Sequence, residues 1–115
     1  MLEPGMHINA VGSFRPEMRE FDVGVVTRAR VFVDSVRACA EEAGELIAAE
    51  AEGAKLRESW TELGALLEGG SSGRSSSEEI TLFKSVGVAE QEACAAGEAI
   101  RRASSMGLGT EVDLS

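Results

Sequence analysis

Residues 10–16, Ala-Val-Gly-Ser-Phe-Arg-Pro, place a glycine, a hydroxyl and a guanidinium directly after an apolar run. That run, Met6–Val11, has the pattern of a short β-strand, and ligands bind at the carboxyl ends of strands in open α/β sheets. Gly12 would let the backbone approach a flat or charged ligand, because glycine has no Cβ. We therefore expect Ala10, Val11 and Gly12 to line a ligand, although the spacing alone favours an ordinary strand-to-loop turn.

The loop after Gly12 carries the next candidate groups. Pro16 restricts Arg15 to extended geometry, which predicts that Ser13 and Arg15 face one side of the loop and Phe14 the other. The planar fork of Arg15 suits a carboxylate or a phosphate. A solvated surface arginine explains the same residue equally well.

A second candidate site lies in the segment Phe-Lys-Ser-Val-Gly at residues 83–87. Ser85 and Gly87 stand at a predicted strand-to-helix junction, where free N–H groups and the helix dipole suit an anionic or carbonyl ligand. Alternatively, Ser85 is simply the N-cap of the helix that follows. Because both segments follow parallel strands, we expect Gly12 and Ser85 to lie side by side at one edge of the sheet.

Other polar residues are assigned structural roles. His7 lies within an apolar run and is expected to be packed and hydrogen-bonded, and Asp34 to cap a helix or close a loop without a chemical role. Glu45, like the other glutamates of the predicted helices, is expected on a solvated face. Cys39 and Cys94 are expected to be buried structural thiols. With one histidine in the chain, a His-rich metal site is excluded.

The strands and helices that must position these residues follow from hydrophobic spacing and from helix start and stop signals. Three strands are predicted, at Met6–Val11, Arg30–Asp34 and Glu79–Lys84. Five helical segments are predicted, at Asp22–Ala29 with Asp22 as N-cap, Ser35–Ala43 with Gly44 as its stop, Leu46–Ala51, Trp60–Leu67, and Val86–Met106 ended by Gly107 and Gly109. Residues 69–77, rich in glycine and serine, form a flexible connector, and Thr110–Leu114 an extended tail. Strands that alternate with helices indicate an α/β fold with parallel pairing.

The composition limits the function classes. The 115 residues are 43% hydrophobic and 27% charged, as in one small globular domain. A net charge of −9 lacks the basic footprint of a nucleic-acid binder. No apolar run approaches the ~20 residues of a membrane helix, and no basic segment followed by an apolar run indicates secretion. We expect a cytoplasmic protein with no nucleic-acid or membrane partner.

The motifs, taken together, resemble the ornithine cyclodeaminase/mu-crystallin family. Residues 7–22 resemble its H-I-N-A-V-G-x-x-x-P…R-E-L-D run, and residues 81–89 resemble its T-x-F-x-S-x-G-x-A motif. Weaker similarities are spread along the chain: V-x-V-D at 31–34, E-x-G-D at 41–45, E-L-G…G-R at 62–74 and G-x-G-T at 107–110.

The resemblance implies an α/β fold that is part of a Rossmann-type domain, with a doubly wound, mainly parallel sheet. Residues 1–85, with a flexible loop at 70–77, would form the second part of a NAD(P)-binding domain. Residues 86–115 would form a long helix and tail that in the family pack on a substrate and dimerisation domain. The family's G-x-G-x-x-G turn is absent from the sequence, so we expect a truncated family member that is inactive alone.

The resemblance also implies site residues and ligands. NAD or NADP would contact Ala10, Val11, Gly12, Ser85 and Gly87, and a small amino acid or cyclic imine would contact Ser13 and Arg15. A homodimer is compatible with the family.

Phe14 stands where the family's cyclodeaminases carry an aspartate that acts on the substrate amine. The loop is therefore more similar to the mu-crystallin or ketimine-reductase branch, which moves a hydride between NAD(P)H and a cyclic imine. The alternatives are a non-catalytic module that binds a small ligand or a partner, and a fragment without a function of its own.

Overall fold

The computed structural model describes residues 1–54 and 57–113. Within these residues, four parallel strands form one sheet in the order β1-β4-β2-β3. The strands are β1 (His7–Ala10), β2 (Arg30–Val33), β3 (Thr61–Glu62) and β4 (Thr81–Lys84). This arrangement confirms the α/β fold class with parallel pairing. It adds a short strand that hydrophobic spacing did not predict.

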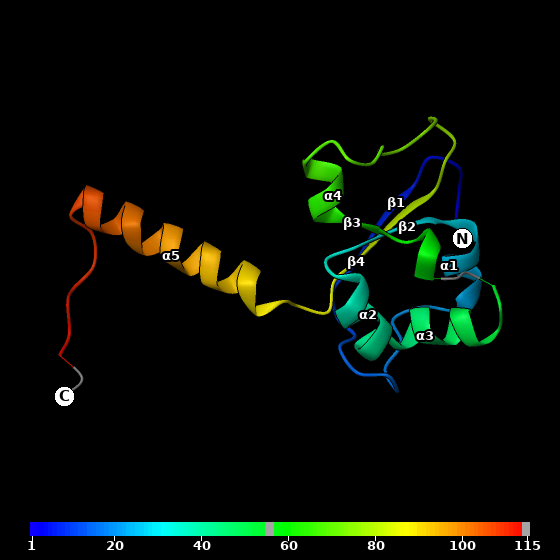
Figure 1. The fold of residues 1–115 in the computed structure, drawn as a ribbon, viewed down its shortest axis with the longest axis horizontal. Coiled ribbons are helices and arrows are strands. Elements are labelled where there is room, and N and C mark those ends of the chain that lie inside the picture. Colours follow the sequence, from blue (N-terminus) through cyan, green and yellow to red (C-terminus); the bar gives the residue numbers. More distant parts are fainter. Residues whose placement is uncertain (55–56, 114–115) are drawn as a thin grey trace.

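The helices of the described residues cover the two faces of the sheet unequally. They are α1 (Val23–Arg28), α2 (Val36–Glu42), α3 (Gly44–Ala51), α4 (Leu63–Leu67) and α5 (Ala89–Met106), with a 3-10 turn at Arg57–Ser59. In the view of Figure 1, α4 lies above the sheet and α2 and α3 lie below it. The main core is on the face of α1–α3, where Val31, Val33 and Leu82 of the sheet and Val26 and Leu46 of the helices are fully buried.

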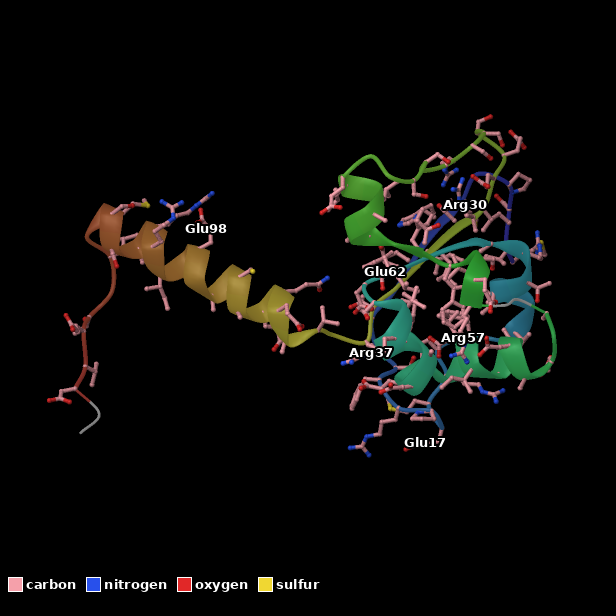
Figure 2. The ribbon with its side chains drawn as sticks, in the orientation of Figure 1. Glu17, Arg30, Arg37, Arg57, Glu62 and Glu98 are labelled. Atoms are coloured by element: carbon pink, nitrogen blue, oxygen red, sulfur yellow. The ribbon has the colours of Figure 1, made fainter. Side chains whose placement is uncertain are left out.

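Helix α5 leaves this core and extends away from the sheet (Figure 1). It begins at Ala89, three residues later than predicted, and none of its residues is buried. Its polar face carries Glu98, which pairs with Arg101 and Arg102 and projects from the helix in Figure 2. The left-handed backbone of Gly107, with φ of 66°, ends the helix as predicted.

Gly44 is not the stop of α2, as the sequence predicted, but the first residue of α3. Only Ala43, in an extended conformation, separates the two helices. The absence of a side chain at Gly44 serves a close approach, because a Cβ there would lie 2.5 Å from the carbonyl oxygen of Pro16. Gly44 therefore lets the loop after β1 pack directly on α3.

The predicted helix Trp60–Leu67 is wrong in its first part. Thr61 and Glu62 form strand β3, paired with Phe32 and Val33 of β2, and the helix begins at Leu63. The leucine spacing at 63–67 indicated the helix correctly. The two residues before it are a strand because they pair with β2 as the outer strand of the sheet. The strand predicted at Glu79–Lys84 likewise begins at Thr81.

Residues 70–77 contain no helix or strand, and two arginines link this connector to the sheet and to the segment before β1. Arg30 of β2 donates to the carbonyl oxygens of Ser72 and Gly73 at 2.7 and 2.6 Å. Arg74, within the connector, donates to the carbonyl oxygen of Met6 at 3.2 Å. The predicted tail has no regular structure at residues 110–113, and Leu114 lies outside the described residues.

The cysteines differ from each other. Cys39 is fully buried in the core, as predicted, whereas Cys94 is exposed on α5. Burial, together with the charge of Asp34 and a hydrogen bond to it, raises the pKa of the Cys39 thiol far above its usual value. Cys39 is therefore an inert structural thiol. Cys94 lies on α5, none of whose residues is buried by the described part of the chain.

Candidate functional site at the carboxyl edge of the sheet

The two segments predicted to bind a ligand lie side by side. Strands β1 and β4 pair in parallel, with Ala10 opposite Lys84, and the N–H of Ser85 donates to the carbonyl oxygen of Ala10 at 3.0 Å. This confirms that Gly12 and Ser85 meet at one edge of the sheet. Val11 is 67% exposed and Gly12 is also exposed, so their backbone is accessible to a ligand.

The loop after Gly12 is oriented differently from the prediction. Ser13 points inward and is only 1% exposed, whereas Phe14 is 49% exposed. The guanidinium of Arg15 lies over the ring of Phe14, 5.5 Å from its centroid, in a cation–π contact. Arg15 therefore shares the outer side of the loop with Phe14 and not the inner side with Ser13.

The inward orientation of Ser13 is explained by a buried charge network. Nζ of Lys84 donates to the carbonyl oxygen and to Oγ of Ser13, both at 2.7 Å, and Ser13 Oγ donates to the carboxylate of Glu45 at 2.8 Å. Lys84 Nζ also lies 3.1 Å from Oε1 of Glu45. Both ionic side chains have zero exposure. The prediction that Glu45 lies on a solvated helix face is therefore wrong.

Glu20 completes this network from the partly exposed side. Its Oε2 accepts from Lys84 Nζ at 3.1 Å, and its side chain is 31% exposed. Burial opposes ionisation of this carboxyl, but the hydrogen bond from Lys84 and the backbone N–H groups of Ser13 and Gly12 outweigh burial and hold its pKa below the usual value. A Cβ at Gly12 would lie 2.7 Å from Oε1 of Glu20. Gly12 thus makes room for this carboxylate beneath the loop.

Asp34, at the end of β2, anchors the second segment. Its Oδ2 accepts from Ser85 Oγ at 2.7 Å and from the N–H groups of Val86 and Gly87 at 2.9 and 3.1 Å. Its Oδ1 accepts from the N–H of Ser35 at 2.7 Å. Burial raises the pKa of Asp34, but these hydrogen bonds lower it by a larger amount. The pKa of Asp34 therefore lies below its usual value.

These contacts rule out one of the two explanations of Ser85, the N-cap of the following helix. Its hydroxyl donates to Asp34, and the N-cap of α5 is Val88, which makes no side-chain cap. Because Asp34 binds the N–H groups of residues 86 and 87, the chain turns here, with φ of 85° at Gly87, and α5 starts later than predicted. Asp34 was expected to cap a helix or to close a loop, and the second holds, since it closes the loop after β4.

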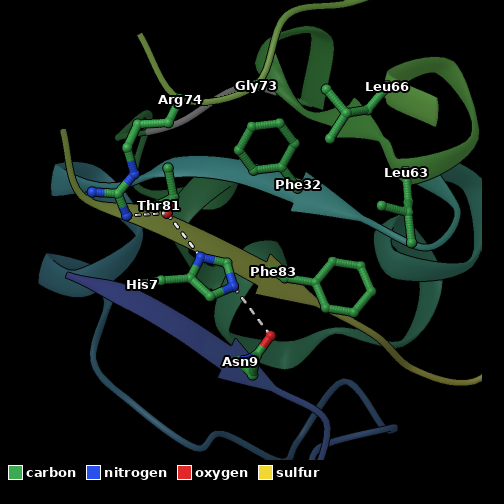
Figure 3. A pocket seen from close by; sticks show the side chains of 9 residues that line it. All are labelled: His7, Asn9, Phe32, Leu63, Leu66, Gly73, Arg74, Thr81 and Phe83. Carbon is green, nitrogen blue, oxygen red and sulfur yellow. Dashed lines mark hydrogen bonds between the residues drawn. The ribbon is translucent and has the colours of Figure 1, made fainter. Parts of the chain in front are cut away.

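A separate pocket of about 460 Å³ lies on the opposite face of the sheet, against α4 (Figure 3). Phe32 and Phe83 form part of its apolar wall. His7 Nδ1 lies 2.8 Å from Thr81 Oγ1, and its Nε2 lies 3.2 Å from Asn9 Oδ1. His7 is hydrogen-bonded as predicted, but its ring is exposed. Strand alternation places these side chains on the other face from Lys84, so this pocket is not part of the carboxyl-edge site.

Residues 1–54 and 57–113 contain no group of three His, Cys, Asp or Glu side chains arranged to hold a metal ion. In the same ranges, no helix combines the length and apolar character needed to cross a membrane.

Comparison with known proteins places the chain in a family. The model of the ornithine cyclodeaminase/mu-crystallin family matches residues 1–106. The chain belongs to this family. The resemblance drawn from the loop and junction motifs is thereby confirmed.

Two curated relatives are similar to this member of the ornithine cyclodeaminase/mu-crystallin family over most of its length. A Delta(1)-pyrroline-2-carboxylate reductase of Bacillus cereus is 39% identical over 115 residues, which cover 98% of this chain and 35% of the reductase. The ketimine reductase mu-crystallin of Macropus fuliginosus is 38% identical over 95 residues, which cover 83% of this chain and 28% of that protein. The chain thus spans about a third of the length of these relatives.

A solved structure shows the same fold with ligands. The Delta(1)-pyrroline-2-carboxylate reductase of Thermococcus litoralis, in complex with NADH and L-proline, aligns with a TM-score of 0.88 and 37% identity, over 96% of this chain and 35% of that one. The segment found here is therefore a part of the family fold that occurs in an NADH-bound reductase.

Sequence reasoning found the exposed segments of the edge but not the side chains that anchor them. Lys84 was not singled out, although one signal was available. Leu82 and Lys84 are two residues apart on one strand and therefore share a face. Because Leu82 belongs to the core face, Lys84 had to point inward and required buried partners of opposite charge.

Proposed function

We propose that this chain forms the nicotinamide side of an NAD(P)-dependent imine reductase that acts on small cyclic imino acids. The observation that carries this proposal is the common edge of Val11–Gly12 and Ser85–Gly87, since ligands bind at the carboxyl edge of parallel sheets. Similarity to a reductase that binds NADH and L-proline supports this choice of cofactor and substrate class. The two free cysteines fit a reducing compartment, in agreement with a cytoplasmic protein.

The residue at position 14 favours reduction over ornithine deamination. Phe14 is half exposed on the outer side of the loop, where the resemblance puts the aspartate of the cyclodeaminases. A phenyl ring neither accepts a proton from a substrate amine nor pairs with its charge. The neighbouring Arg15 is exposed and suits the carboxylate of an imino acid.

In this proposal, the chain's own residues bind and orient. NAD(P)H, when bound, supplies the hydride. The exposed backbone of Val11 and Gly12, with Ala10 buried behind it, and the Ser85–Gly87 junction would hold the nicotinamide between them. Ser13 was predicted to contact the substrate through the same loop. Its side chain is turned inward, and its N–H and carbonyl oxygen bind Glu20 and Lys84. Ser13 therefore orients the loop and offers the substrate no polar group of its own.

Residues 86–115 are proposed to pack on the remaining part of the family fold, which includes a substrate and dimerisation domain, in a homodimer. Helix α5 is unburied here, and Ile100 is 68% exposed on it. If α5 packs against the rest of the family fold, Cys94 is expected to be protected from thiol reagents in the chimera with the full-length reductase. In the isolated chain of residues 1–115, Cys94 is expected to react. Equal reactivity in both contradicts this placement.

The function is tested in a chimera. Residues 1–115 replace the matching third of the Thermococcus litoralis reductase, and NAD(P)H oxidation with a cyclic imine is measured beside the release of ammonia from ornithine. We expect imine reduction and no ammonia release. Phe14→Asp is expected to add a trace of deamination without loss of cofactor binding, because Val11 and Gly12 are unchanged. Robust deamination with Phe14 in place would refute the assignment.

A further inference from the structure

Every N–H donor of Lys84 is occupied within the protein. An ammonium group has three donors, and those of Lys84 reach Ser13 O, Ser13 Oγ and Glu20 Oε2 at 2.7, 2.7 and 3.1 Å. The side chain has zero exposure, and Glu45 lies 3.1 Å away on its inner side. Lys84 therefore has no free donor for a substrate or a cofactor. The ammonium group of Lys84 instead holds the loop that contains Ser13.

The place of Lys84 in the fold determines what it can hold. It is the last residue of β4 and directly precedes Ser85. Through Ser13 it binds the loop that follows β1, and through Glu45 it binds α3. One buried side chain thus joins both candidate cofactor segments to the helix layer beneath them.

We propose that Lys84, together with Glu20 and Glu45, is a positioning residue of the nicotinamide side of this site. Its ammonium fixes residues 11–14 against the end of β4, so that the Val11–Gly12 backbone and the Ser85–Gly87 junction form a preformed edge. The proposal deepens the proposed function and rests on it for the identity of the ligand.

Glu20 offers the cleanest test of this network. It is the network's partly exposed carboxylate, so its neutralisation leaves Lys84 paired with the buried Glu45. Glu20→Gln keeps the shape of the side chain and removes its charge. A matched control is Glu50→Gln, because Glu50 also binds one cation, Arg57, which is labelled in Figure 2 at a distance from the carboxyl edge.

The first measurement is amide hydrogen exchange on residues 1–115, by NMR. In Glu20→Gln we expect the amides of residues 11–20 to exchange about tenfold faster, which is the effect of about 1.4 kcal/mol. The amide of Leu82, in the middle of β4, is expected to exchange at its original rate. In Glu50→Gln the loop is expected to be unchanged. Equal loop exchange in the two variants would overturn the proposal.

The second measurement separates positioning from folding, in the active chimera described above. A loosened edge raises the KM for the imine and for NADH by about tenfold, whereas a merely structural defect lowers the amount of folded enzyme and leaves KM unchanged. A faster-exchanging loop with unchanged KM values overturns the proposal. If the unmodified chimera has no reductase activity, the proposed function fails, and hydrogen exchange at residues 11–14 and 85–87 still decides whether the network holds the edge.

Discussion

Replacement of Lys84 by methionine is expected to destabilise residues 1–115 severely. Methionine nearly conserves the length and volume of the lysine side chain, so the change removes the charge and not the packing. Glu45 is then left with zero exposure and without its cation, and among the described residues the Ser13 hydroxyl is its one remaining hydrogen-bond donor. An uncompensated buried charge costs far more than a surface ion pair.

The expected loss follows from burial. Removing one partner of a buried ion pair costs about 3–5 kcal/mol, a fifth or more of the ~5–15 kcal/mol that stabilises a domain. At an unfolding entropy of ~2.1 cal/mol/K per residue, the 115 residues have about 0.24 kcal/mol/K, so the Tm falls by about 12–21 °C. Glu45→Gln alone should cost less, about 1–3 kcal/mol, because Lys84 keeps Glu20 as its counter-charge.

The assay is urea unfolding followed by circular dichroism, with the double variant Lys84→Met/Glu45→Gln as the decisive comparison. The double variant contains no unpaired buried charge, and the glutamine still accepts from Ser13, so we expect it to recover at least half of the loss. A loss below about 1 kcal/mol in Lys84→Met, or a double variant no more stable than Lys84→Met, would refute this reasoning.

Three further outcomes are expected. Gly44→Ala should destabilise by more than about 2 kcal/mol, since its methyl would lie 2.5 Å from a loop carbonyl oxygen, while Gly64→Ala, with open space around it, should be neutral or stabilising in the same unfolding assay. The folded-state pKa of Asp34 is lowered, so its contribution to stability is present above its unfolded pKa of about 3.9 and is lost as the pH falls through the folded value; Asp34→Asn should therefore flatten the acid limb of the stability–pH curve. A thiol reagent should modify Cys94 at once and Cys39 only on unfolding, and two fast thiols would contradict the structure.

The outline of the edge could be predicted from the sequence because its strands are short apolar runs. On the face covered by α1–α3, the residues of β2 and β4 are buried, while in β1 Ala10 is buried and Ile8 partly buried, and this burial produces the pattern. A glycine directly after one such run and a serine directly after another then indicated a common edge. Parallel pairing confirms it.

The partners of the anchoring side chains could not be predicted in the same way, because they lie far from those side chains in the chain. Glu45 has the sequence context of a solvated helix glutamate, and only the packing of α3 beneath the loop buries it. The error at Gly44 has the same origin. Glycine after a helical run is typical of a helix end, but here its missing side chain admits the loop after β1.

The two anchors, Lys84 and Asp34, hold the carboxyl edge with side chains of opposite charge. Lys84 binds the carbonyl oxygen of Ser13 in the first segment, and Asp34 binds N–H groups of the second segment. Both anchors act from the inner side, and the N–H of Gly12 binds Glu20. A ligand would therefore meet the exposed outer surface of Val11 and Gly12 and not that N–H. The side chain of Phe14 is half exposed and lies against Arg15 on the outer side of the loop. Under the proposed function, a change of side chain at position 14 is therefore expected to alter the chemistry offered to a substrate while the proposed cofactor edge stays in place.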